Sequence, residues 1–499
     1  MVVVTGPARR AVATLFSHAA RALPHADVSE ARIVQGHSEI VFVPSDELVR
    51  APRTASIVLV DEAAALPLPQ LQRLLTLYSR VVFSTTVNGY EGTGQGFVLR
   101  FQALLNSCCR SWYNHTDGLT EPIRWAAGDS TEQWLAELLF LDAKMAPHQA
   151  VCAVAAEELD IAVFGGQDLL DRPAFLTELL GLLKGAHYQN TPDDIRYPLD
   201  HTNVKVVVLC HGKHPVAAAQ LSCEGGFDAA LAEDVWHRRR RPKGHLLPQT
   251  LACQGGCRAV LRCRSVRVMR IVVHPAVQSR GVGSFLLEQA EQLATSWGHD
   301  FIGSSFGATT DLLRFWSKNR WATLHVGSTL NKSSGCYSTV VGKPLSVGGQ
   351  EICQQLQGRF CALLPYRLRD GLNELDSQLV ALLLRECRTA PLSPTERETL
   401  YGFAGQQRSY DSTLVELVRM AETLFPTLCE KLSAAERTLL VSKVLQSQSW
   451  AKACQRSGIA GKKMAERCLA QIVAQLLQWS SQKPEKTAEK TQQQGVRPA

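Results

Sequence analysis

The sequence predicts an α/β protein with three folded regions followed by a short polar tail. Up to about residue 345, short β-branched apolar runs alternate with amphipathic helical stretches, which is typical of sheets covered by helices. Beyond residue 350 only helical periodicity remains. The chain has 499 residues, of which 45% are hydrophobic, enough for about three packed domains. We place them at residues 1–145, 146–345 and 350–480, with a disordered tail at 481–499.

Composition and charge exclude several classes of protein. The chain has no apolar run of about eighteen residues, so no membrane-spanning helix is expected. The N-terminal Met1-Val-Val-Val-Thr-Gly6 lacks the basic and long apolar segments of a signal peptide. The 15 cysteines are scattered without zinc-ligand spacing, which indicates reduced thiols in a cytoplasmic protein. The net charge of +7 permits an RNA partner without requiring one, and nothing in the sequence predicts a protein partner.

The first region has the alternation of a parallel α/β sheet. Its first strand starts at the second residue, so we expect the sheet to be cut off on its N-terminal side. The predicted strands are 2–5, 39–43, 57–60 and 81–84, and the predicted helices are 8–23 and 68–78.

Two acidic residues end the third of these strands. Val58-Leu-Val-Asp61-Glu62 has the form of a Walker B element, in which an aspartate binds Mg²⁺ and a glutamate orients water at a γ-phosphate. A strand end that happens to be acidic is the alternative. The glycine-rich stretch 84–97 could pass for a phosphate loop, but it has no Lys-Ser/Thr pair, and Arg124 follows in Pro122-Ile-Arg124-Trp125.

The middle region contains a glycine loop between a strand and a helix. Ile271-Val272-Val273 predicts a buried strand, His274-Pro275 ends it, and a turn with Gly281 and Gly283 leads into the helix. Such a loop presents unpaired backbone N–H groups to an anion, and the glycines let a phosphate approach closely. An ordinary turn is the alternative. The helix has one apolar stripe, formed by Leu286, Ala290, Leu293, Ala294 and Trp297.

The pattern Val-His-Pro-x-x-Gln-x-x-Gly-x-Gly resembles the acetyl-CoA loop of the GNAT acetyltransferases. The resemblance implies that the strand lines the pantetheine arm and that the loop amides hold the pyrophosphate. It also implies cofactor contacts from a later helix, at Asp311 and Lys318, where the family often has Glu and Arg. The acetyl-CoA residues that it implies are Ile271, Val272, Val273, Gln278, Ser279, Arg280, Gly281, Val282, Gly283, Ser284, Asp311 and Lys318.

The rest of this region is also predicted to alternate between helices and strands. Helices are predicted at 150–163, 172–183 and 311–318, and strands at 204–209, 216–222 and 301–305.

A basic run precedes the glycine loop. Such a run next to an active site is what neutralisation of RNA phosphates requires, although a solvated loop is the alternative. Further arginines follow, and Arg262 and Arg264 are expected to share a strand face, so the sequence predicts a basic rim around the acyl site. The predicted RNA-binding residues are Arg239, Arg240, Arg241 and Lys243.

Several ordered motifs extend the resemblance over about residues 1–470. Asp61-Glu-Ala-Ala-Ala65, the Ser84 to Phe97 stretch and Pro122-Ile-Arg-Trp-Ala126, followed by the GNAT loop, resemble the bacterial tRNA(Met) cytidine acetyltransferases. That family joins a RecA-like helicase-type ATPase module to a GNAT domain and a tRNA-binding tail domain. It acetylates N4 of the wobble cytidine of elongator tRNA(Met), coupled to ATP hydrolysis. The resemblance implies a nucleotide site at Asp61, Glu62 and Arg124, with Mg²⁺ on Asp61.

The chain departs from the family in one respect. No Gly-x-x-x-x-Gly-Lys-Ser/Thr motif occurs, so most phosphate contacts of the ATP site are missing and we expect ATP hydrolysis to be weak or absent. A misplaced start codon and a shortened protein both remain open. Two other functions also remain open: a GNAT that acetylates protein amines beside a relic ATPase module, and a non-catalytic RNA-binding protein.

The catalytic base stays unassigned between two histidines. N4 of cytosine must lose a proton as it attacks a thioester, and the oxyanion needs donors such as the amide near Val273. His274 is nearest to the acyl end and has a suitable pKa, but a structural histidine at the strand exit is the alternative. His187, beside Tyr188, is the second candidate.

The C-terminal region predicts a helical bundle. Apolar stripes occur at 375–387, 394–403, 412–425, 434–446 and 461–479.

Overall fold

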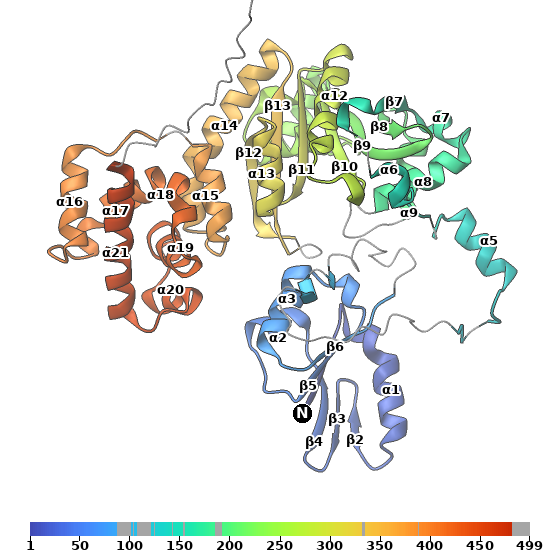
Figure 1. Ribbon diagram of the computed structural model, residues 1–499, viewed down its shortest axis with the longest axis horizontal. Coiled ribbons are helices and arrows are strands. Elements are labelled where there is room, and N and C mark those ends of the chain that lie inside the picture. The colour runs from blue at the N-terminus through green and yellow to red at the C-terminus, as the bar shows by residue number, and fades with distance from the viewer. Residues whose placement is uncertain are drawn as a thin grey trace, which may run out of the picture. The chain divides into compact units, whose positions relative to one another are not determined.

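A computed structural model describes residues 1–86, 101–102, 104–106, 121–123, 125–141, 143–152, 155–184, 192–331, 335–387 and 389–481 (Figure 1). The chain divides into two compact units. The first comprises Met1–Thr309 with Phe315–Phe360, and the second comprises Thr310–Arg314 with Cys361–Ala499. The first unit contains two separate sheets.

The N-terminal sheet has six strands in the order β2-β3-β4-β1-β5-β6. Strands β4, β1, β5 and β6 are parallel, as predicted, and their four positions confirm the predicted strands within one residue at each end. The antiparallel strands β2 and β3 extend one edge. Neither strand was predicted from the sequence; β2 is fully exposed and has no apolar pattern. The strands are β1 Val2–Thr5, β2 Asp27–Ser29, β3 Arg32–Gln35, β4 Ser38–Phe42, β5 Ile57–Val60 and β6 Val81–Phe83.

Helices cover both faces of this sheet. Helix α1 packs through Phe16 against Val4 and Ile33 on one face. On the other face, α2 and α3 bury Leu48, Leu71 and Leu74 with the alternate residues of β1 and β5. The helices are η1 Arg9–Val12, α1 Ala13–Ala22, α2 Ser45–Arg50, η2 Ala63–Ala65, α3 Leu68–Leu77 and, farther along the chain, α5 Ser130–Leu138.

The second sheet has seven strands in the order β12-β13-β11-β10-β9-β8-β7. Neighbouring strands are antiparallel except for β10 and β11, which run parallel. The strands are β7 Asp160–Phe164, β8 Val204–His211, β9 His214–Gly225, β10 Arg264–Val273, β11 Phe301–Gly307, β12 Ala322–Leu330 and β13 Tyr337–Pro344.

Each face of this sheet carries one main helix. Helix α12 buries Leu286, Ala290 and Ala294 on one face, so the predicted stripe is confirmed. On the other face, α8 packs its leucines against Ala218 and Val272. The helices are α6 His148–Val151, η3 Ala156–Glu158, α7 Gly166–Leu170, α8 Pro173–Lys184, α9 Pro192–Asp200, η5 Pro275–Val277, α12 Val282–Ser296 and α13 Thr310–Lys318.

One predicted helix of this region is wrong. Among the described residues of the range 150–163, helical structure is limited to the end of the single turn α6 and the short η3, and Asp160–Phe164 forms an edge strand, β7. The alanines and glutamates of the range favour a helix locally. The β-branched Ile161 and Val163 nevertheless pair with Leu209 and Val207 of β8, and this tertiary pairing overrides the local preference.

Residues 226–263 form a helical insertion between β9 and β10. Gly225 pairs with Arg264, so the insertion leaves and rejoins the sheet at the same place. Its helices are α10 Ala229–Trp236, α11 Leu246–Cys253 and η4 Arg258–Leu261, and they share a core with Phe301. Arg262 caps η4 and lies outside β10, so the predicted shared strand face with Arg264 is wrong.

The C-terminal region is helical, as predicted. All five predicted helices are present, and the structure adds α14 and α20 to them. No helix among the described residues is long and apolar enough to cross a membrane. The helices are α14 Val347–Leu368, α15 Ser377–Arg385, α16 Pro394–Ala404, η6 Asp411–Thr413, α17 Leu414–Thr423, α18 Phe425–Leu428, η7 Cys429–Lys431, α19 Ala434–Leu440, η8 Val441–Leu445, α20 Trp450–Ser457 and α21 Lys462–Ser481.

Candidate active site

The two parallel strands in the middle of the second sheet separate part-way along their length. Pairing of β10 with β11 ends at Val268 opposite Ser304, where the Ser304 hydroxyl donates a hydrogen bond to the Val268 carbonyl at 2.9 Å. The register of β10 against β9 breaks between Val268 and Arg270. Beyond the break, β10 pairs with β9 alone, while β11 continues along β13. The backbone from Ile271 to Val273 therefore has an edge toward β11 with which no described strand pairs.

The glycine loop follows directly from this free edge. The Gln278 side-chain amide donates to the Val273 carbonyl at 2.9 Å and so fixes the start of the loop. Ser279 and Gly281 then adopt φ angles of +62° and +89°, and helix α12 begins at Val282. The first amides of a helix have no intrahelical acceptor, so those of α12 point into the loop as an anion site.

Backbone conformation requires glycine at position 281, whereas at position 283 a side chain would be in close contact with its neighbours. Gly281 has open space around it, but its positive φ is strained for any residue with a Cβ. A Cβ on Gly283 would meet the side chains of Phe315 and Val273, each at 3.4 Å. Behind the loop, Glu291 of α12 accepts hydrogen bonds from Trp321 Nε1 at 2.7 Å and Lys343 Nζ at 2.6 Å, which hold the helix to the far strands.

His274 lies at the end of β10 with both ring nitrogens occupied. Nδ1 accepts from the Ala276 amide at 3.2 Å, and Nε2 lies 2.9 Å from the Ala146 carbonyl, so the neutral ring donates there. The residue is buried, and this burial, with a contribution from His148, lowers the pKa of His274. These contacts favour the structural alternative over a catalytic base.

The other charged residues predicted to bind acetyl-CoA form few polar contacts with the rest of the described protein. Arg280 donates to the Cys152 carbonyl at 2.5 Å. Asp311 and Lys318 are exposed on α13, and neither forms an ion pair within the described part of the chain. His187 and Tyr188 lie outside the described residues, as does Arg124 of the predicted nucleotide site.

Asp61 lies at the carboxyl end of β5, beside Gly6 at the end of β1. Its Oδ1 accepts from the Ser84 hydroxyl at 2.6 Å and from the Glu62 amide at 3.0 Å. Glu62 has a left-handed backbone with φ of +50°. Three neighbouring strand ends thus bring Gly6, Asp61 and Ser84 to one edge of the sheet, the usual place for a ligand in an open α/β fold.

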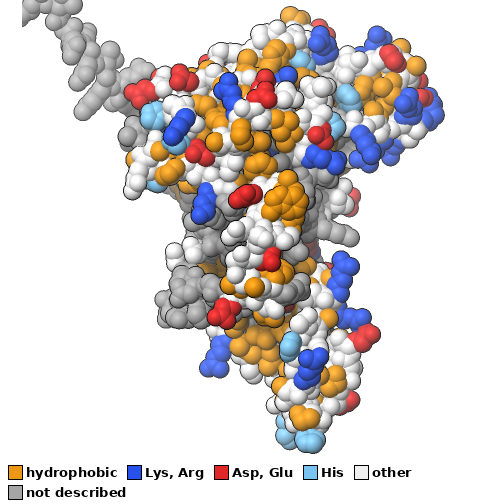
Figure 2. All heavy atoms as spheres, turned by 90° about the vertical axis from the view of Figure 1, so that its right-hand side faces the viewer, with side chains coloured by type: hydrophobic (Ala, Val, Ile, Leu, Met, Phe, Trp, Pro, Cys, Tyr) orange, Lys and Arg blue, Asp and Glu red, His pale blue; other side chains and the backbone are white. Residues whose placement is uncertain are grey.

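The basic run lies in the insertion, after α10. Arg239 is bound by Asp234, with Nε 2.8 Å from Oδ1, and Arg238 donates to the Cys253 carbonyl. Arg240, Arg241 and Lys243 are exposed, and none of them has an acidic partner among the described residues. On the face shown in Figure 2, basic and acidic side chains are interspersed over most of the surface, in keeping with the modest net charge.

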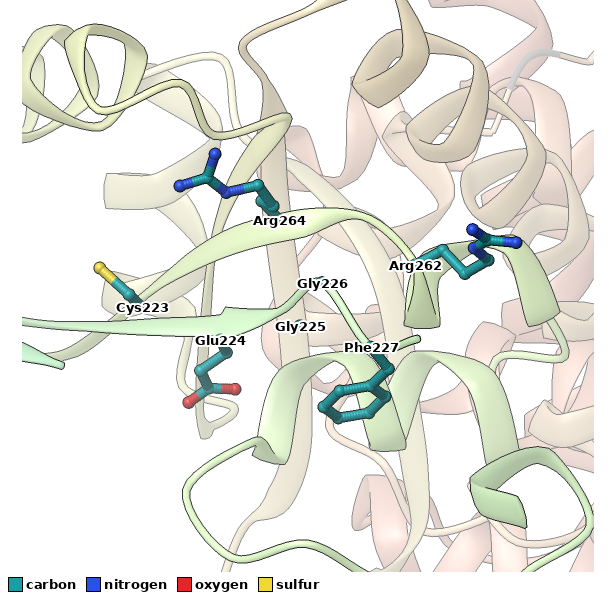
Figure 3. Close-up of a pocket in the computed structure, with 7 residues that line it drawn as sticks. All are labelled: Cys223, Glu224, Gly225, Gly226, Phe227, Arg262 and Arg264. Atoms are coloured by element: carbon teal, nitrogen blue, oxygen red, sulfur yellow. The ribbon is translucent and has the colours of Figure 1, made fainter. Parts of the chain in front are cut away.

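A shallow cavity of about 410 Å³ opens where the insertion meets β10. Figure 3 shows Arg262 and Arg264 on opposite sides of it, with the Glu224 side chain directed to the other face of the strand from Arg264. Arg264 begins β10 and the glycine loop follows its end, so roughly 30 Å of strand separates them. These arginines therefore lie apart from the acyl loop, and the predicted rim around the acyl site does not include them. The cavity is lined by Cys223, Glu224, Gly225, Gly226, Phe227, Arg262 and Arg264.

The sequence analysis missed a buried ion pair on β9 and β10. Arg267 Nε lies 2.5 Å from Oε1 of Glu224, whose side chain is fully buried, and the Leu247 amide donates to Oε2 at 2.8 Å. Burial raises the pKa of Glu224, while Arg267 opposes that shift. The polar residues 220, 222 and 224 alternate within an otherwise apolar strand, and this period of two was the available signal.

The sequence matches place these domains in a family. Residues 1–142 match the helicase domain of RNA cytidine acetyltransferase NAT10/TcmA, and residues 178–299 and 286–346 match GNAT acetyltransferase 2. The tRNA(Met) cytidine acetyltransferase TmcA of Nitrosococcus halophilus is 40% identical over 92% of this chain. TmcA of Vibrio cholerae is 36% identical over 95% of it. Both matched domains therefore resemble those of the RNA cytidine acetyltransferases.

The match to these family members covers only part of their length. The chain spans 62% of the Nitrosococcus protein and 65% of the Vibrio protein. Among solved structures, a Bacillus subtilis acetyltransferase in complex with CoA is 15% identical, with a TM-score of 0.24, over 38% of this chain and 99% of its own.

Proposed function

We propose that this chain is an acetyl-CoA-dependent acyltransferase that acetylates N4 of the wobble cytidine of elongator tRNA(Met). The observation that carries the proposal is the free edge of β10 at Ile271–Val273, which runs directly into a glycine loop and a helix N-terminus. This arrangement suits a ligand with an extended amide-bearing arm that ends in a pyrophosphate. The relatives named as tRNA(Met) cytidine acetyltransferases supply the acceptor.

Each part of the loop has a role in this proposal. The amides of Gly281 to Ser284 and the loop residues Gln278 to Arg280 bind the pyrophosphate. The edge of β10 holds the arm in register and exposes an amide near Val273 to the reacting carbonyl. Acetyl-CoA supplies an activated thioester at that point. The Val273 region then stabilises the oxyanion, as preorganised backbone donors do in acyl transfer.

The reaction requires removal of one proton. A bond forms between N4 and the acetyl carbon, the C–S bond breaks, and the N4 proton leaves by way of a base, with CoA departing as the thiol. His187 is our candidate for the base. His274 instead orients the strand exit, because both of its ring nitrogens are engaged. Asp311 and Lys318 on α13 are proposed to contact the cofactor.

We assign the RNA contacts to the insertion and the C-terminal helices. Arg240, Arg241 and Lys243 offer free positive charge for the phosphate backbone, and Arg239 contributes less because Asp234 neutralises it. The proposed domains are an ATPase-like module at 1–145, a GNAT domain at 146–345 and a tRNA-binding domain at 350–480, in a cytoplasmic protein. ATP with Mg²⁺ at Asp61, Glu62 and Arg124 is the weakest assignment, because the chain contains no Walker A motif.

The test uses the purified full chain, labelled acetyl-CoA and an elongator tRNA(Met) transcript, with and without ATP and Mg²⁺. We expect label on the wobble cytidine without a requirement for ATP. Label on protein amines alone would support the protein acetyltransferase instead. Binding of the tRNA without any transfer, at saturating acetyl-CoA, would support a non-catalytic RNA-binding protein.

A further inference from the structure

One face of the second sheet carries a line of polar side chains beside the point where β10 and β11 separate. Directly opposed residues of antiparallel strands share a face. Gln220 is opposite Arg270, Ser222 is opposite Arg267, and Glu224 is opposite Ser265. These six positions therefore form one stripe across β9 and β10, which we call the polar stripe.

Apolar helices cover the two ends of this face. Toward the carboxyl end of β10, α8 packs on Ala218 and Val272. Toward the other end, the insertion packs on Phe301, and the Leu247 amide of α11 binds Glu224. The polar stripe lies between these two apolar patches, where a polar ligand would meet polar side chains.

Most of the stripe already has partners. Glu224 and Arg267 bind each other, and Ser222 accepts from the Asn203 side chain at 3.4 Å. Gln220 is the exception: the residue is only 2% exposed and no described residue forms a hydrogen bond with its side-chain amide, yet the amide is absent from the fully enclosed polar atoms that lack a partner, so it still reaches accessible space. Buried amides almost always have partners, because an unpaired one costs free energy. The Gln220 amide, which has no protein partner among the described residues and reaches accessible space, is therefore available to a polar ligand.

The position of Gln220 identifies which part of the reaction it serves. Gln220 is paired with Arg270, which is the first residue of β10 after the register break. At this point β10 stops pairing with β11, and the free edge begins. Opposed Cβ atoms lie about 4.5–5.5 Å apart, so the Gln220 side chain lies beside the start of that edge, roughly 10 Å of strand from Val273. It lies on the face of the sheet, whereas the free edge lies in its plane. A cofactor on the edge and an acceptor held by Gln220 on the face would thus meet between Gln220 and Val273.

We propose that the Gln220 amide binds the amidine edge of the acceptor nucleobase. Oε1 accepts a hydrogen bond from one proton of the exocyclic amine, and Nε2 donates to the adjacent ring nitrogen. In cytosine these atoms are N4 and N3, so one amine proton is held while the other is left for removal. Protein amines have no neighbouring ring acceptor and would make only half of this contact. The proposal rests on the proposed function and names the residue that orients its acceptor.

The test combines a change in the protein with a change in the RNA. Gln220→Met keeps the volume and removes both polar atoms. An anticodon stem-loop with 3-deazacytidine at the wobble position removes only the ring acceptor. In both proteins, kcat/KM on the 3-deazacytidine RNA is compared with kcat/KM on the cytidine RNA. We expect this ratio to fall about ten times further in wild type than in Gln220→Met, since one well-formed hydrogen bond contributes about that factor. Equal effects in both proteins would overturn the proposal.

A matched control separates binding from stability. Gln446 in the C-terminal helices is equally buried, but its Nε2 donates to the Leu372 and Leu375 carbonyls and its Oε1 accepts from Arg456. Gln446→Met should lower the melting temperature, and the deaza substitution should lower its kcat/KM by the same factor as in wild type. Gln220→Met should keep or raise the melting temperature and still lower kcat/KM on cytidine roughly ten- to hundredfold. A fall in melting temperature with unchanged kcat/KM would make Gln220 a structural residue.

Failure of the proposed function gives a different result. If wild type transfers no acetyl group to the cytidine stem-loop or the full tRNA, the proposed function itself is wrong. If wild type transfers the group and Gln220→Met matches it on both RNAs, only the role of Gln220 is wrong.

Discussion

Nε of Arg239 lies 2.8 Å from Oδ1 of Asp234, so one arginine of the basic run is already neutralised within the protein. The next two arginines and Lys243 have no such partner among the described residues. The basic run at 238–243, which the sequence presents as one block, is therefore divided into a bound part and a free part. Only the free part can replace counterions on an RNA backbone without first breaking an ion pair.

The first prediction concerns the salt dependence of RNA binding. Replacing Arg240, Arg241 and Lys243 by alanine should weaken tRNA binding and lower the slope of log K against log salt, by about 0.7–0.9 for each phosphate that the variant no longer neutralises. Arg239→Ala, the matched control, should change the slope much less. Fluorescence anisotropy at several salt concentrations measures both. Equal slopes for wild type and the triple variant would exclude the insertion from the RNA interface.

The second prediction separates the cofactor role of Gly281 from its backbone role. Gly281→Ala should lower the affinity for acetyl-CoA about tenfold or more, because a Cβ at φ of +89° distorts the anion site. Gly212, in the turn between β8 and β9, also has a positive φ and open space around it. Gly212→Ala should lose a similar stability, roughly 1 kcal/mol, with unchanged affinity. Calorimetric titration and thermal unfolding give the two readouts, and equal affinities would refute the loop assignment.

The third prediction concerns pH and His274. Because its folded pKa is lowered, the unfolded chain binds the proton more readily, and stability is lost as pH falls below about 6.5 toward the folded pKa. Burial lowers the pKa values of His245 and His299 in the same direction, so the wild-type melting temperature should fall on acidification.

The variant His274→Leu should reduce that pH dependence. It should also destabilise the protein by roughly 1–3 kcal/mol at pH 7.5, because the Ala146 carbonyl and the Ala276 amide lose their partner. The pH profile of acetyl transfer should keep its shape. A variant with the full wild-type melting temperature and no transfer would instead identify His274 as the base.

The fourth prediction concerns ATP. Purified protein should release phosphate from ATP at background rate with or without tRNA, and Asp61→Asn should not change that rate. The Asp61 carboxylate is already bound by Ser84 and the Glu62 amide, and the chain lacks the lysine-bearing phosphate loop. RNA-stimulated turnover that Asp61→Asn abolishes would contradict this prediction.

Local patterns in the sequence predicted much of the fold. The strand at Ile271–Val273, the glycine turn and the stripe from Leu286 to Ala294 follow from short-range chemistry, and each is present. Edge strands were harder to predict, because β2 is fully exposed and buries no side chain, and β7 takes its strand form from pairing with β8. For both β2 and β7, tertiary pairing with a neighbouring strand, and not the local sequence, determines the strand.

The candidate site also has one part that the sequence predicts and one part that depends on tertiary contacts. The loop residues are contiguous, so a motif identifies them, but the role of His274 depends on Ala146, far away in sequence. Gln220 and Arg270 meet only through the β9–β10 register. The polar residues of β9 were visible in the sequence, yet nothing in the sequence indicated which of them would lack a partner.

The insertion between β9 and β10 departs and returns at adjacent positions, since Gly225 and Arg264 face each other. Changes of length or charge within it therefore need not shift one strand against the other. The basic segment can diversify over evolution while the spacing of Gln220, Arg270 and the glycine loop is inherited unchanged. Recognition of the RNA body and the geometry of the reacting atoms can in this way evolve as separate modules.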